Sequence, residues 1–496
     1  MRLDALELLP GATLHGDTSV EVAGIAYDSR AVNAGDLFAC LVGGYVDGHD
    51  YAASAVERGV VALLVNRRLP IEVTQIVVAD TRKALPVIAA SFYGDPADQL
   101  TVVGITGTDG KTTTSYILDH ILRSAGTVTG VIGTVSVRIA DQVVDHETRQ
   151  TTPESSDVQR LLREMVDAGV THAILEATSH GLSLYRLDNL TFAVAAVTNI
   201  TSEHLEHHGT VEDYRAAKGS LFRRVGKPGR FSVVNLDDEG ARSMLDWGEG
   251  ASEITYSLSD PSATLRASGV LPLGTTTRFT LEVGRERWEV VLPLVGTFNV
   301  SNALCAVGVA IACGVDAGMA VAALGDTPQI PGRLEVVDPS RPVRTIVDYA
   351  HTPASLEVMM ELLRGSSPDG RLIAVFGSAG ERDVPKRAMQ GAVAAKLADL
   401  AVFTNEDPRE EDELAILGDI ADGARAEGWV DGEQFWLIPD RRLAIRHAVS
   451  LAEPGDVLLL AGKGHERSII VGQRKLPWHE SRVAAEELAR RFGACP

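Results

Sequence analysis

Short apolar runs, separated by stretches with helical periodicity, constrain this chain more than any other feature. The runs are TVVGIT (101–106), THAILEAT (171–178), FAVAAVTNI (192–200), TIVDYA (345–350), RLIAVFG (371–377), LAVFTN (400–405) and DVLLLAG (456–462). Runs of this length without polar alternation are typical of strands buried on both faces of a mainly parallel sheet. After Lys111, the residues Ile117, Leu118, Ile121 and Leu122 fall on one helical face, and Gly126 is a suitable stop. Alternation of strands and helices on this scale predicts a doubly wound α/β fold.

The 496 residues are too many for one hydrophobic core. We expect three domains: a smaller α/β domain at 1–98, a central mainly parallel domain at 99–332 and a Rossmann-like domain at 333–496. The boundaries follow from DPADQL (95–100) and from GDTPQIPGR (325–333), which reads as a linker. In the first domain, GDLFACLV, VVALLVN and IVVADT are the predicted strands. The segment 250–295 alternates polar and apolar residues, and we expect antiparallel strands there.

Composition excludes several classes of function. The formal net charge of −21 has the wrong sign for a protein that tracks nucleic-acid phosphates. The four cysteines show no CxxC pair or zinc-ligand spacing, so a disulfide scaffold or zinc site is not expected. The acidic N-terminus does not look like a signal peptide, and no run of about 18 apolar residues predicts a membrane span. We therefore expect a cytoplasmic protein.

Polar clusters follow the carboxyl end of nearly every predicted strand. They are TGTDGKTTT, the SH after EAT, TSEH, HTP, SAGERD, EDPRE and KGHE. Because ligands of open α/β sheets bind at the carboxyl ends of the strands, these clusters predict an active site built from many loops.

The cluster GITGTDGKTTT (104–114) lies between a predicted strand and a predicted helix. Glycines there let backbone N–H groups surround phosphate oxygens at a helix N-terminus. Lys111 would reach the terminal phosphates, and Thr112 or Thr113 would place a hydroxyl on Mg²⁺. The spacing GxxxxGK[ST] is not met, since Ile105 occupies the first glycine position. The alternative is a plain glycine-rich turn, but the strand–loop–helix context favours nucleotide phosphate binding.

Glu176 and His204 follow two of the predicted strands and would reach the same edge as the phosphate loop. A carboxylate and an imidazole there are able to hold a divalent ion that bridges substrate phosphates. Lys218, in DYRAAKGSLF, reads from the pattern alone as a solvated helix lysine.

A family resemblance rests on a longer set of motifs in order: TGTDGKTTT, EATSHGL, TNITSEHLEHHG, EDYRAAKGSLF, GTFNVSNA, PGRLEVV and DYAHTP. In sequence and spacing they resemble the Mur ligases, from Tyr27 to Glu466. The block YDSRAVNAGDLFACLVGGYVDGHD narrows the resemblance to the tripeptide synthetase branch of that family. The resemblance implies a UDP-sugar domain, a central ATPase domain and a C-terminal Rossmann-like domain.

The resemblance also implies roles for individual residues. Lys218 matches a carbamylated lysine that supplies an anionic Mg²⁺ ligand, together with Thr112, Glu176 and His204. The implied nucleotide contacts are Gly107, Thr108, Asp109, Gly110, Lys111, Thr112, Thr113, Asn299, Arg333, Asp348 and His351. The implied UDP-precursor contacts are Ser29, Thr151, Thr152, Thr178 and Arg186. Two positions depart from the family: Asp109 replaces an asparagine, and Leu184 stands where some relatives have glutamine.

The incoming amino acid is implied to bind at Arg387, Glu406, Asp407, Pro408, Arg409, Gly462 and Glu466. Relatives that add meso-diaminopimelate carry DNPR where this chain has Glu406–Arg409. Arg409 is suited to a side-chain carboxylate, which favours diaminopimelate. Asp407 in place of asparagine favours a terminal ammonium instead, so L-lysine and L-ornithine remain alternatives.

The implied reaction is an ATP-dependent ligation in peptidoglycan synthesis, with ATP and Mg²⁺ as cofactors. A diamino acid is joined to UDP-N-acetylmuramoyl-L-alanyl-D-glutamate through an acyl phosphate. One alternative is another ligase of the superfamily, such as a folylpolyglutamate synthetase; the DSR, DGHD, EDPR and GKGHE elements oppose it. A P-loop kinase or regulatory NTPase is the other alternative, and three ligand-bearing domains would serve it no purpose.

Overall fold

The computed structural model describes residues 1–44, 46–144, 150–201, 205–366 and 369–493. They form two compact units, described separately below. The first unit comprises 1–269, 279–290 and 298–325, and the second comprises 270–278, 291–297 and 326–496. The predicted domain boundaries after residues 98 and 332 stay predictions. No helix among the described residues is long and apolar enough to cross a bilayer.

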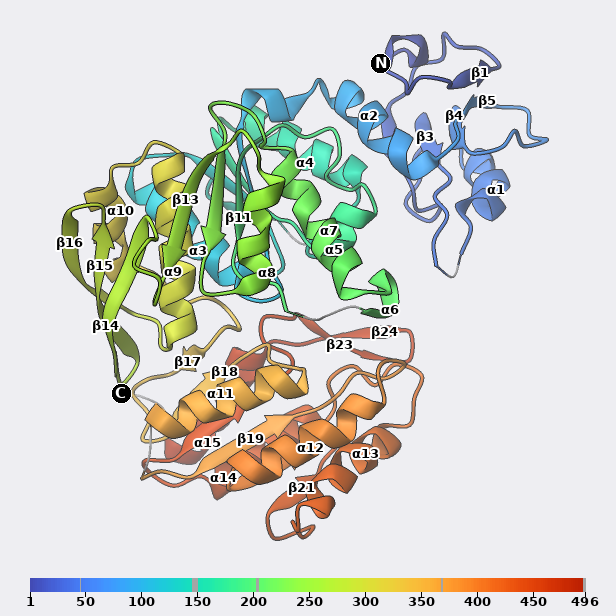
Figure 1. Ribbon diagram of the computed structural model, residues 1–496. Coiled ribbons are helices and arrows are strands. Elements are labelled where there is room, and N and C mark those ends of the chain that lie inside the picture. The colour runs from blue at the N-terminus through green and yellow to red at the C-terminus, as the bar shows by residue number, and fades with distance from the viewer. Residues whose placement is uncertain (45, 145–149, 202–204, 367–368, 494–496) are drawn as a thin grey trace. The chain divides into compact units, whose positions relative to one another are not determined.

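The first unit begins with a five-stranded sheet in the order β1-β5-β4-β3-β2 (Figure 1). The strands are β1 (Thr13–His15), β2 (Gly24–Ala26), β3 (Asp36–Ala39), β4 (Ala62–Val65) and β5 (Thr74–Val77). β2 to β5 are parallel, and β1 pairs antiparallel with β5. The three strands predicted in this region correspond to β3, β4 and β5. The helices here are α1 (Ala52–Glu57) and α2 (Thr81–Tyr93), and Asp80 caps the N-terminus of α2.

An eleven-stranded sheet follows, in the order β16-β15-β14-β13-β12-β11-β6-β10-β7-β8-β9. The predicted runs at 101–106, 171–178 and 192–200 become β6 (Thr101–Thr106), β10 (His172–Glu176) and β11 (Phe192–Val197). β6 pairs parallel with β10 on one side and with β11 on the other. The loop after β6 therefore lies between the loops after β10 and β11. The remaining strands are β7 (Thr129–Ile132), β8 (Val137–Ile139), β9 (Gln142–Val144), β12 (Phe231–Asn235), β13 (Ser252–Ser257), β14 (Leu265–Leu273), β15 (Thr276–Val283) and β16 (Glu286–Leu292).

Helices cover this sheet, and α3 (Lys111–Ser124) has the face that the sequence predicted. Ile117, Leu118, Ile121 and Leu122 are all buried. The helix stops where Gly126 takes a φ of +83°. The other helices of this part are α4 (Ser155–Asp167), α5 (Ser179–Ser183), α6 (Leu205–His208), α7 (Val211–Arg223), α8 (Glu239–Arg242), α9 (Thr297–Ala312) and α10 (Ala317–Ala323).

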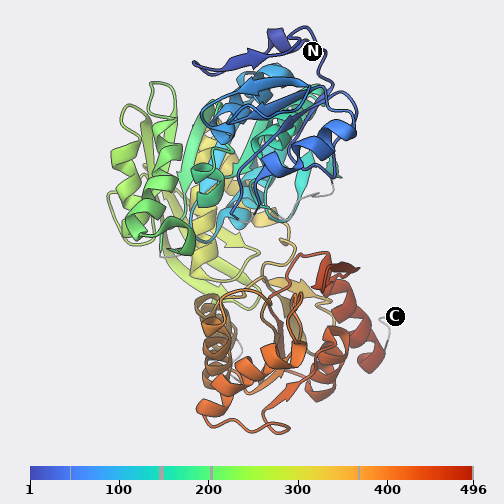
Figure 2. The same cartoon turned by 90° about the vertical axis from the view of Figure 1, so that its right-hand side faces the viewer.

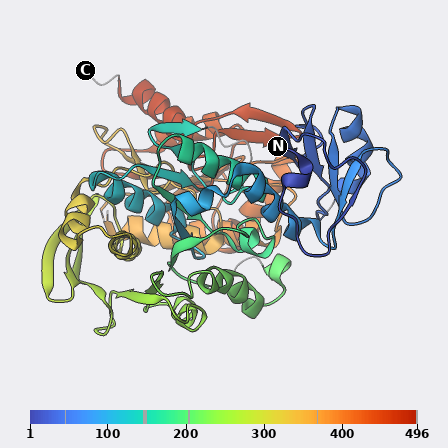
Figure 3. The ribbon, with the colours of Figure 1, turned by 90° about the horizontal axis from the view of Figure 1, so that it is seen from above.

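The prediction of antiparallel strands throughout 250–295 was wrong for β13. This strand pairs parallel with β12 and parallel with β14. The chain returns from β12 through α8 and a 3₁₀ helix (Ser243–Trp247), and such a crossover connection makes the two strands parallel. Alternation reports that one face is exposed, not which way a strand runs. β14 to β16 form the outer end of the sheet, yellow-green in Figure 3.

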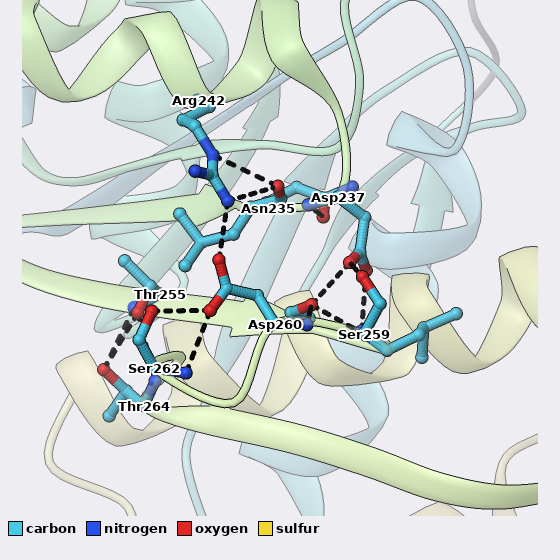
Figure 4. Close-up of polar contacts among 11 residues, drawn as sticks. Asn235, Asp237, Arg242, Thr255, Ser259, Asp260, Ser262 and Thr264 are labelled. Carbon is cyan, nitrogen blue, oxygen red and sulfur yellow. Dashed lines mark hydrogen bonds and ion pairs between the residues drawn. The ribbon is translucent and has the colours of Figure 1, made fainter.

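A polar network fixes the turns beyond β12 and β13 (Figure 4). Asp237 accepts hydrogen bonds from the Ser257 and Ser259 hydroxyls at 2.5 and 2.6 Å, and Arg242 pairs with Asp260 at 2.6 Å. In the same region Asn235 donates its amide to the carbonyl of Thr198 at 2.7 Å, so the end of β12 supports the loop after β11.

The second unit contains a six-stranded sheet in the order β17-β18-β22-β19-β20-β21. The four runs predicted here become β18 (Arg344–Val347), β19 (Leu372–Phe376), β20 (Leu400–Phe403) and β22 (Val457–Leu460). These strands and β21 (Phe435–Leu437) are parallel, and β17 (Glu335–Val337) is antiparallel to β18.

Helices lie on both faces of this sheet (orange and red in Figure 2) and bury two separate apolar clusters. One cluster includes α11 (Pro353–Ser366), α12 (Pro385–Leu397) and α13 (Glu413–Ala426). The other includes α14 (Arg441–Leu451) and α15 (Glu480–Phe492). A hairpin of β23 (Ser468–Val471) and β24 (Arg474–Pro477) precedes α15. The carboxyl ends of the strands in this sheet carry the polar clusters that the sequence singled out.

Candidate functional site

The phosphate loop connects β6 to α3 and requires glycine at two positions. Gly107 has a φ of +150°, and a Cβ on it would lie 1.9 Å from the Thr198 hydroxyl. Gly110 has a φ of +83°, and a Cβ there would lie 2.3 Å from Asn302 Oδ1. Any side chain at either position would collide with a neighbouring element, so the loop packs closely against Thr198 and Asn302 only because both residues are glycines.

Residues after β11 hold this loop in place. The N–H of Thr108 donates to the Asn199 carbonyl at 2.8 Å, and the N–H of Asp109 donates to Asn199 Oδ1 at 2.9 Å. The Thr198 hydroxyl donates to the Asp109 carbonyl at 2.5 Å. The Asp109 side chain is exposed, so its carboxylate stands at the loop surface on a fixed backbone. The sequence motif TNI had pointed to this edge without giving Thr198 or Asn199 a role.

Lys111 lies over the loop from the first turn of α3. Its ammonium donates to the carbonyls of Gly107 and Thr108 at 2.9 and 2.8 Å. Thr113, like Thr112, is buried in the same turn. The lysine is thus already held at the loop, where a phosphate oxygen would exchange for a carbonyl.

Glu176, at the end of β10, is buried beside the loop. Its Oε2 accepts hydrogen bonds from the hydroxyls of Thr112 at 3.0 Å and Thr134 at 2.7 Å. Thr134 follows β7, a strand that was not predicted. The buried Glu176 carboxylate and the Thr112 hydroxyl supply hard oxygen atoms, which are the ligands that Mg²⁺ prefers.

Lys218 is buried, not solvated, which corrects the pattern-based reading of this residue. It extends from α7, donates from Nζ to the Gly107 carbonyl at 2.6 Å and lies 4.6 Å from the centre of the Tyr214 ring. It therefore reaches the same loop as Lys111. His204 lies outside the described residues. Within those residues, no cluster of three or more His, Cys, Asp or Glu side chains has metal-binding geometry.

Near Glu176 lie three of the residues that the family resemblance assigns to the UDP precursor, namely Thr151, Thr152 and Thr178. The Thr152 hydroxyl bonds to the Glu176 carbonyl at 2.8 Å and to the Thr178 hydroxyl at 2.9 Å. Thr151 bonds to Thr134 at 2.9 Å. Arg186 donates to the Thr152 carbonyl at 3.0 Å.

Ser29, in the five-stranded part of this unit, is half-buried. Leu184 ends α5 and is partly exposed. The threonine set consists of Thr134, Thr151, Thr152 and Thr178. Glu176 bonds both to members of this set and to Thr112, next to the phosphate loop.

Asn299 lies on α9 of the first unit and accepts a hydrogen bond from Asn302, which in turn bonds to Thr114 of α3. Arg333, Asp348 and His351 belong to the second unit. Arg333 lies over the Tyr349 ring at 4.8 Å, and His351 packs against the same ring at 4.8 Å.

Asp348 is buried, which raises the pKa of its carboxyl. It accepts backbone N–H groups from Leu334 at 2.8 Å and Ala350 at 2.7 Å. The Asp348 carboxyl therefore fixes the residue directly after Arg333 and the residue directly after Tyr349.

The ends of β20 and β22 bring together the acids assigned to the amino acid. Lys463 is fully buried and pairs with Asp407 at 2.9 Å and also with Glu466. Asp407 accepts a second hydrogen bond from the N–H of Ile470 at 2.8 Å. Asp407 is therefore held by a lysine that it shares with Glu466 and by a backbone N–H.

Glu406 has a different environment. Burial raises the pKa of its carboxyl, and its Oε2 takes no hydrogen bond from the described residues. Gly462 has a φ of +96°, and a Cβ there would lie 3.5 Å from that oxygen. Glu406 is therefore the acid of this cluster that is ready for a ligand.

The two arginines assigned to this site also differ. Arg387 is buried and donates to Glu411 at 2.8 Å and Asp419 at 3.0 Å, so its charge is neutralised by the protein. Arg409 follows Pro408 with a φ of +55°, and its nearest carboxylate, Glu381, is 3.9 Å from Nη1.

The Nε of Arg409 is buried without a partner among the described residues. Burial raises the pKa of the Tyr349 phenol, and the exposed Arg382 of the SAGERD segment is close enough to oppose that rise. The Nε of Arg387 also lacks a partner among these residues, but two acids hold the Arg387 guanidinium closely, whereas Arg409 has only Glu381 at 3.9 Å.

These features place the candidate ligand-binding residues of each unit at the carboxyl ends of parallel strands. Comparison with known proteins specifies the class. Residues 21–93 match the Mur ligase family catalytic domain, 105–310 the Mur ligase middle domain and 332–464 the Mur ligase glutamate ligase domain. The chain belongs to the Mur ligase family, which consists of ATP-dependent ligases.

Similar proteins agree along almost the whole chain. It is 43% identical to the UDP-N-acetylmuramyl-tripeptide synthetase of a Roseiflexus species, over 95% of both chains. It is 39% identical to the UDP-N-acetylmuramoyl-L-alanyl-D-glutamate–2,6-diaminopimelate ligase of Geobacillus kaustophilus, over 99% of both chains. A solved structure of a ligase with the latter description superimposes with a TM-score of 0.65 at 28% identity, over 95% of both chains.

Proposed function

We propose that the enzyme adds meso-diaminopimelate to UDP-N-acetylmuramoyl-L-alanyl-D-glutamate in an ATP-dependent step of peptidoglycan synthesis. One observation carries the choice of amino acid. Asp407 pairs with Lys463, whereas Glu406 and Arg409 of the same loop each have a polar atom without a partner among the described residues. An ammonium and a carboxylate on one carbon, as at the far end of diaminopimelate, match that pair. Lysine and ornithine offer only the ammonium.

In the proposed arrangement, residues 1–98 and the threonine set hold the precursor, residues 99–332 hold ATP, and residues 333–496 hold the amino acid. ATP and a UDP-linked precursor are cytoplasmic metabolites, so the reaction belongs in the cytoplasm. The relatives whose printed names specify 2,6-diaminopimelate support this choice over other ligases of the superfamily.

The chemistry begins with the terminal carboxylate of the precursor attacking the γ-phosphorus of ATP. The bond to the β–γ bridging oxygen breaks, and an acyl phosphate and ADP result. Lys111 stabilises the charge on the transferred phosphoryl group, and the N–H groups of the loop orient it. The amino group of diaminopimelate then attacks the acyl carbon, phosphate leaves, and the nitrogen loses a proton as the amide forms.

Thr112 and Glu176 would hold Mg²⁺, since their oxygen atoms already face one another at 3.0 Å. His204 and a carbamate on Lys218 complete the proposed ligand set. Bound Mg²⁺ would neutralise phosphate charge during the transfer. An unmodified ammonium at Lys218 would oppose a second cation, whereas its carbamate is an oxygen ligand at the Gly107 side of the loop.

The test supplies the enzyme with ATP and the UDP-dipeptide precursor and compares meso-diaminopimelate, L-lysine and L-ornithine as acceptors. We expect ADP release to require an acceptor, with meso-diaminopimelate the best, and the tripeptide product to appear by mass spectrometry. Better turnover with lysine or ornithine would reject the amino acid assignment. ADP release that is independent of both acceptor and precursor would reject ligase activity.

A further inference from the structure

One ion pair of the second unit has no role in the reaction described above. Arg441 is the first residue of α14, and Glu480 is the first residue of α15. Both side chains are fully buried. The Nε of Arg441 donates to Glu480 at 3.1 and 3.0 Å, and its Nη2 donates at 2.6 Å. The Trp478 indole donates to the same carboxylate at 2.5 Å.

The rest of the Arg441 guanidinium reaches the two loops that carry the amino-acid residues. Nη1 donates to the Asn405 carbonyl at 3.0 Å, directly before Glu406. Nη2 donates to the Ala461 carbonyl at 2.7 Å, directly before Gly462. One planar group therefore binds the last residue before each loop.

Sheet topology explains why such a bridge is needed. Asn405 follows β20 and Ala461 follows β22, and these strands are not neighbours, because β19 lies between them. Each is tied to β19, through the N–H of Thr404 to the Phe376 carbonyl and the N–H of Ala461 to the Val375 carbonyl, but β20 and β22 share no hydrogen bond with each other. The guanidinium spans the end of β19 and joins the two carbonyls in one rigid plane.

We propose that Arg441, locked by Glu480, is a positioning residue that sets the distance between the Glu406–Arg409 loop and the Gly462–Glu466 loop, and thereby the affinity for the incoming amino acid. This inference rests on the proposed amino-acid site. A lysine in place of Arg441 would keep the charge beside Glu480. It would lose the planar fork that holds both carbonyls at once. The loops would then be free to separate, and geometric displacement of about 1 Å is costly in an active site.

The test compares Arg441→Lys with Arg446→Lys. Arg446 is on the same helix and pairs with Glu487 of α15 at 2.8 Å, but it is partly exposed and does not contact the loops. We expect Arg441→Lys to raise the KM for the accepted amino acid by at least about tenfold. The KM values for ATP and for the precursor should stay near those of the wild type, and Arg446→Lys should leave all three unchanged. An equal rise in all three KM values, or an equal effect of both variants, would overturn the proposal.

A second measurement does not depend on the proposed activity. Amide hydrogen exchange should become faster at Arg409, Glu466 and Ile470 in Arg441→Lys and not in Arg446→Lys, because these amides depend on the loop contacts. Faster exchange in an enzyme that ligates no amino acid would support the bridge while rejecting the proposed function. Unchanged exchange would reject the bridge.

Glu480→Gln, which keeps the shape of the pair, should also speed exchange at these amides and raise the KM for the amino acid. If both Arg441→Lys and Glu480→Gln failed to fold, the pair would serve the core rather than the loops, and the proposal would fall.

Discussion

Replacing Arg409 with alanine tests how the enzyme selects its amino acid. The Arg409 side chain is 28% exposed, and its nearest carboxylate is 3.9 Å away, so it has little to lose within the protein. A hydrogen bond to a charged group in such a site contributes about 1.5–3 kcal/mol. Because about 1.4 kcal/mol corresponds to a factor of ten, the KM for meso-diaminopimelate should rise roughly ten- to a hundredfold.

The assay measures ADP release at saturating ATP and precursor while the amino acid is varied. Lysine has no carboxylate at its far end, so its KM should change by less than about fivefold, the range of an exposed ion pair. Arg425→Ala is the control, since Arg425 pairs with Asp422 on the outer face of α13 and should leave both KM values unchanged. Parallel rises for lysine and diaminopimelate would show that Arg409 supports the loop and does not read the substrate.

Three substitutions and one calorimetric measurement test the rest of the site. Lys218→Ala should nearly abolish ligation, and a small carboxylic acid added in solution should restore part of it; full activity of the variant would exclude a carbamate ligand. Lys111→Ala should remove ATP turnover but keep precursor binding by calorimetry, and equal loss of both would show that the two sites are not separate. Asp109→Asn removes an exposed negative charge that would repel phosphates, and exposed charge pairs contribute about 0.2–1 kcal/mol, so ADP without Mg²⁺ should bind up to about fivefold more tightly; unchanged or weaker binding would show that the exposed carboxylate does not reach the phosphates. Burial raises the pKa of Glu406, and an ammonium beside it would lower that pKa, so amino-acid binding should release protons increasingly as the pH falls toward the raised value; equal calorimetric enthalpies in buffers of different ionisation enthalpy would contradict this.

Much of the fold could be predicted because buried parallel strands have a simple signature. All seven apolar runs became strands, and the glycine-rich segment with Lys111 connects a strand to a helix as predicted. The direction of β13 could not be read from alternation, since alternation depends on exposure and direction depends on the connection.

Which charged residues of the site pair with one another could not be predicted from the sequence either. Asp407 and Lys463 are 56 residues apart, and nothing local indicates that they form an ion pair. Arg387 and Arg409 both lie in polar segments, yet only the folded chain shows that two acids form ion pairs with Arg387. Lys218 looked like a surface residue because its helix is polar, whereas its position against the phosphate loop buries it.

The threonines around Glu176 have a direction as well as a position. A carboxylate only accepts hydrogen bonds, so Thr134 must give its one hydroxyl proton to Glu176, and Thr151 must give its proton to Thr134. Likewise Thr152 gives its proton to the Glu176 carbonyl, and Thr178 gives its proton to Thr152. Each hydroxyl proton of the set is therefore used within the network around Glu176. The Thr151 hydroxyl has only lone pairs left for a ligand. A precursor group that bonds to the Thr151 hydroxyl must therefore be a donor, such as an amide N–H or a sugar hydroxyl.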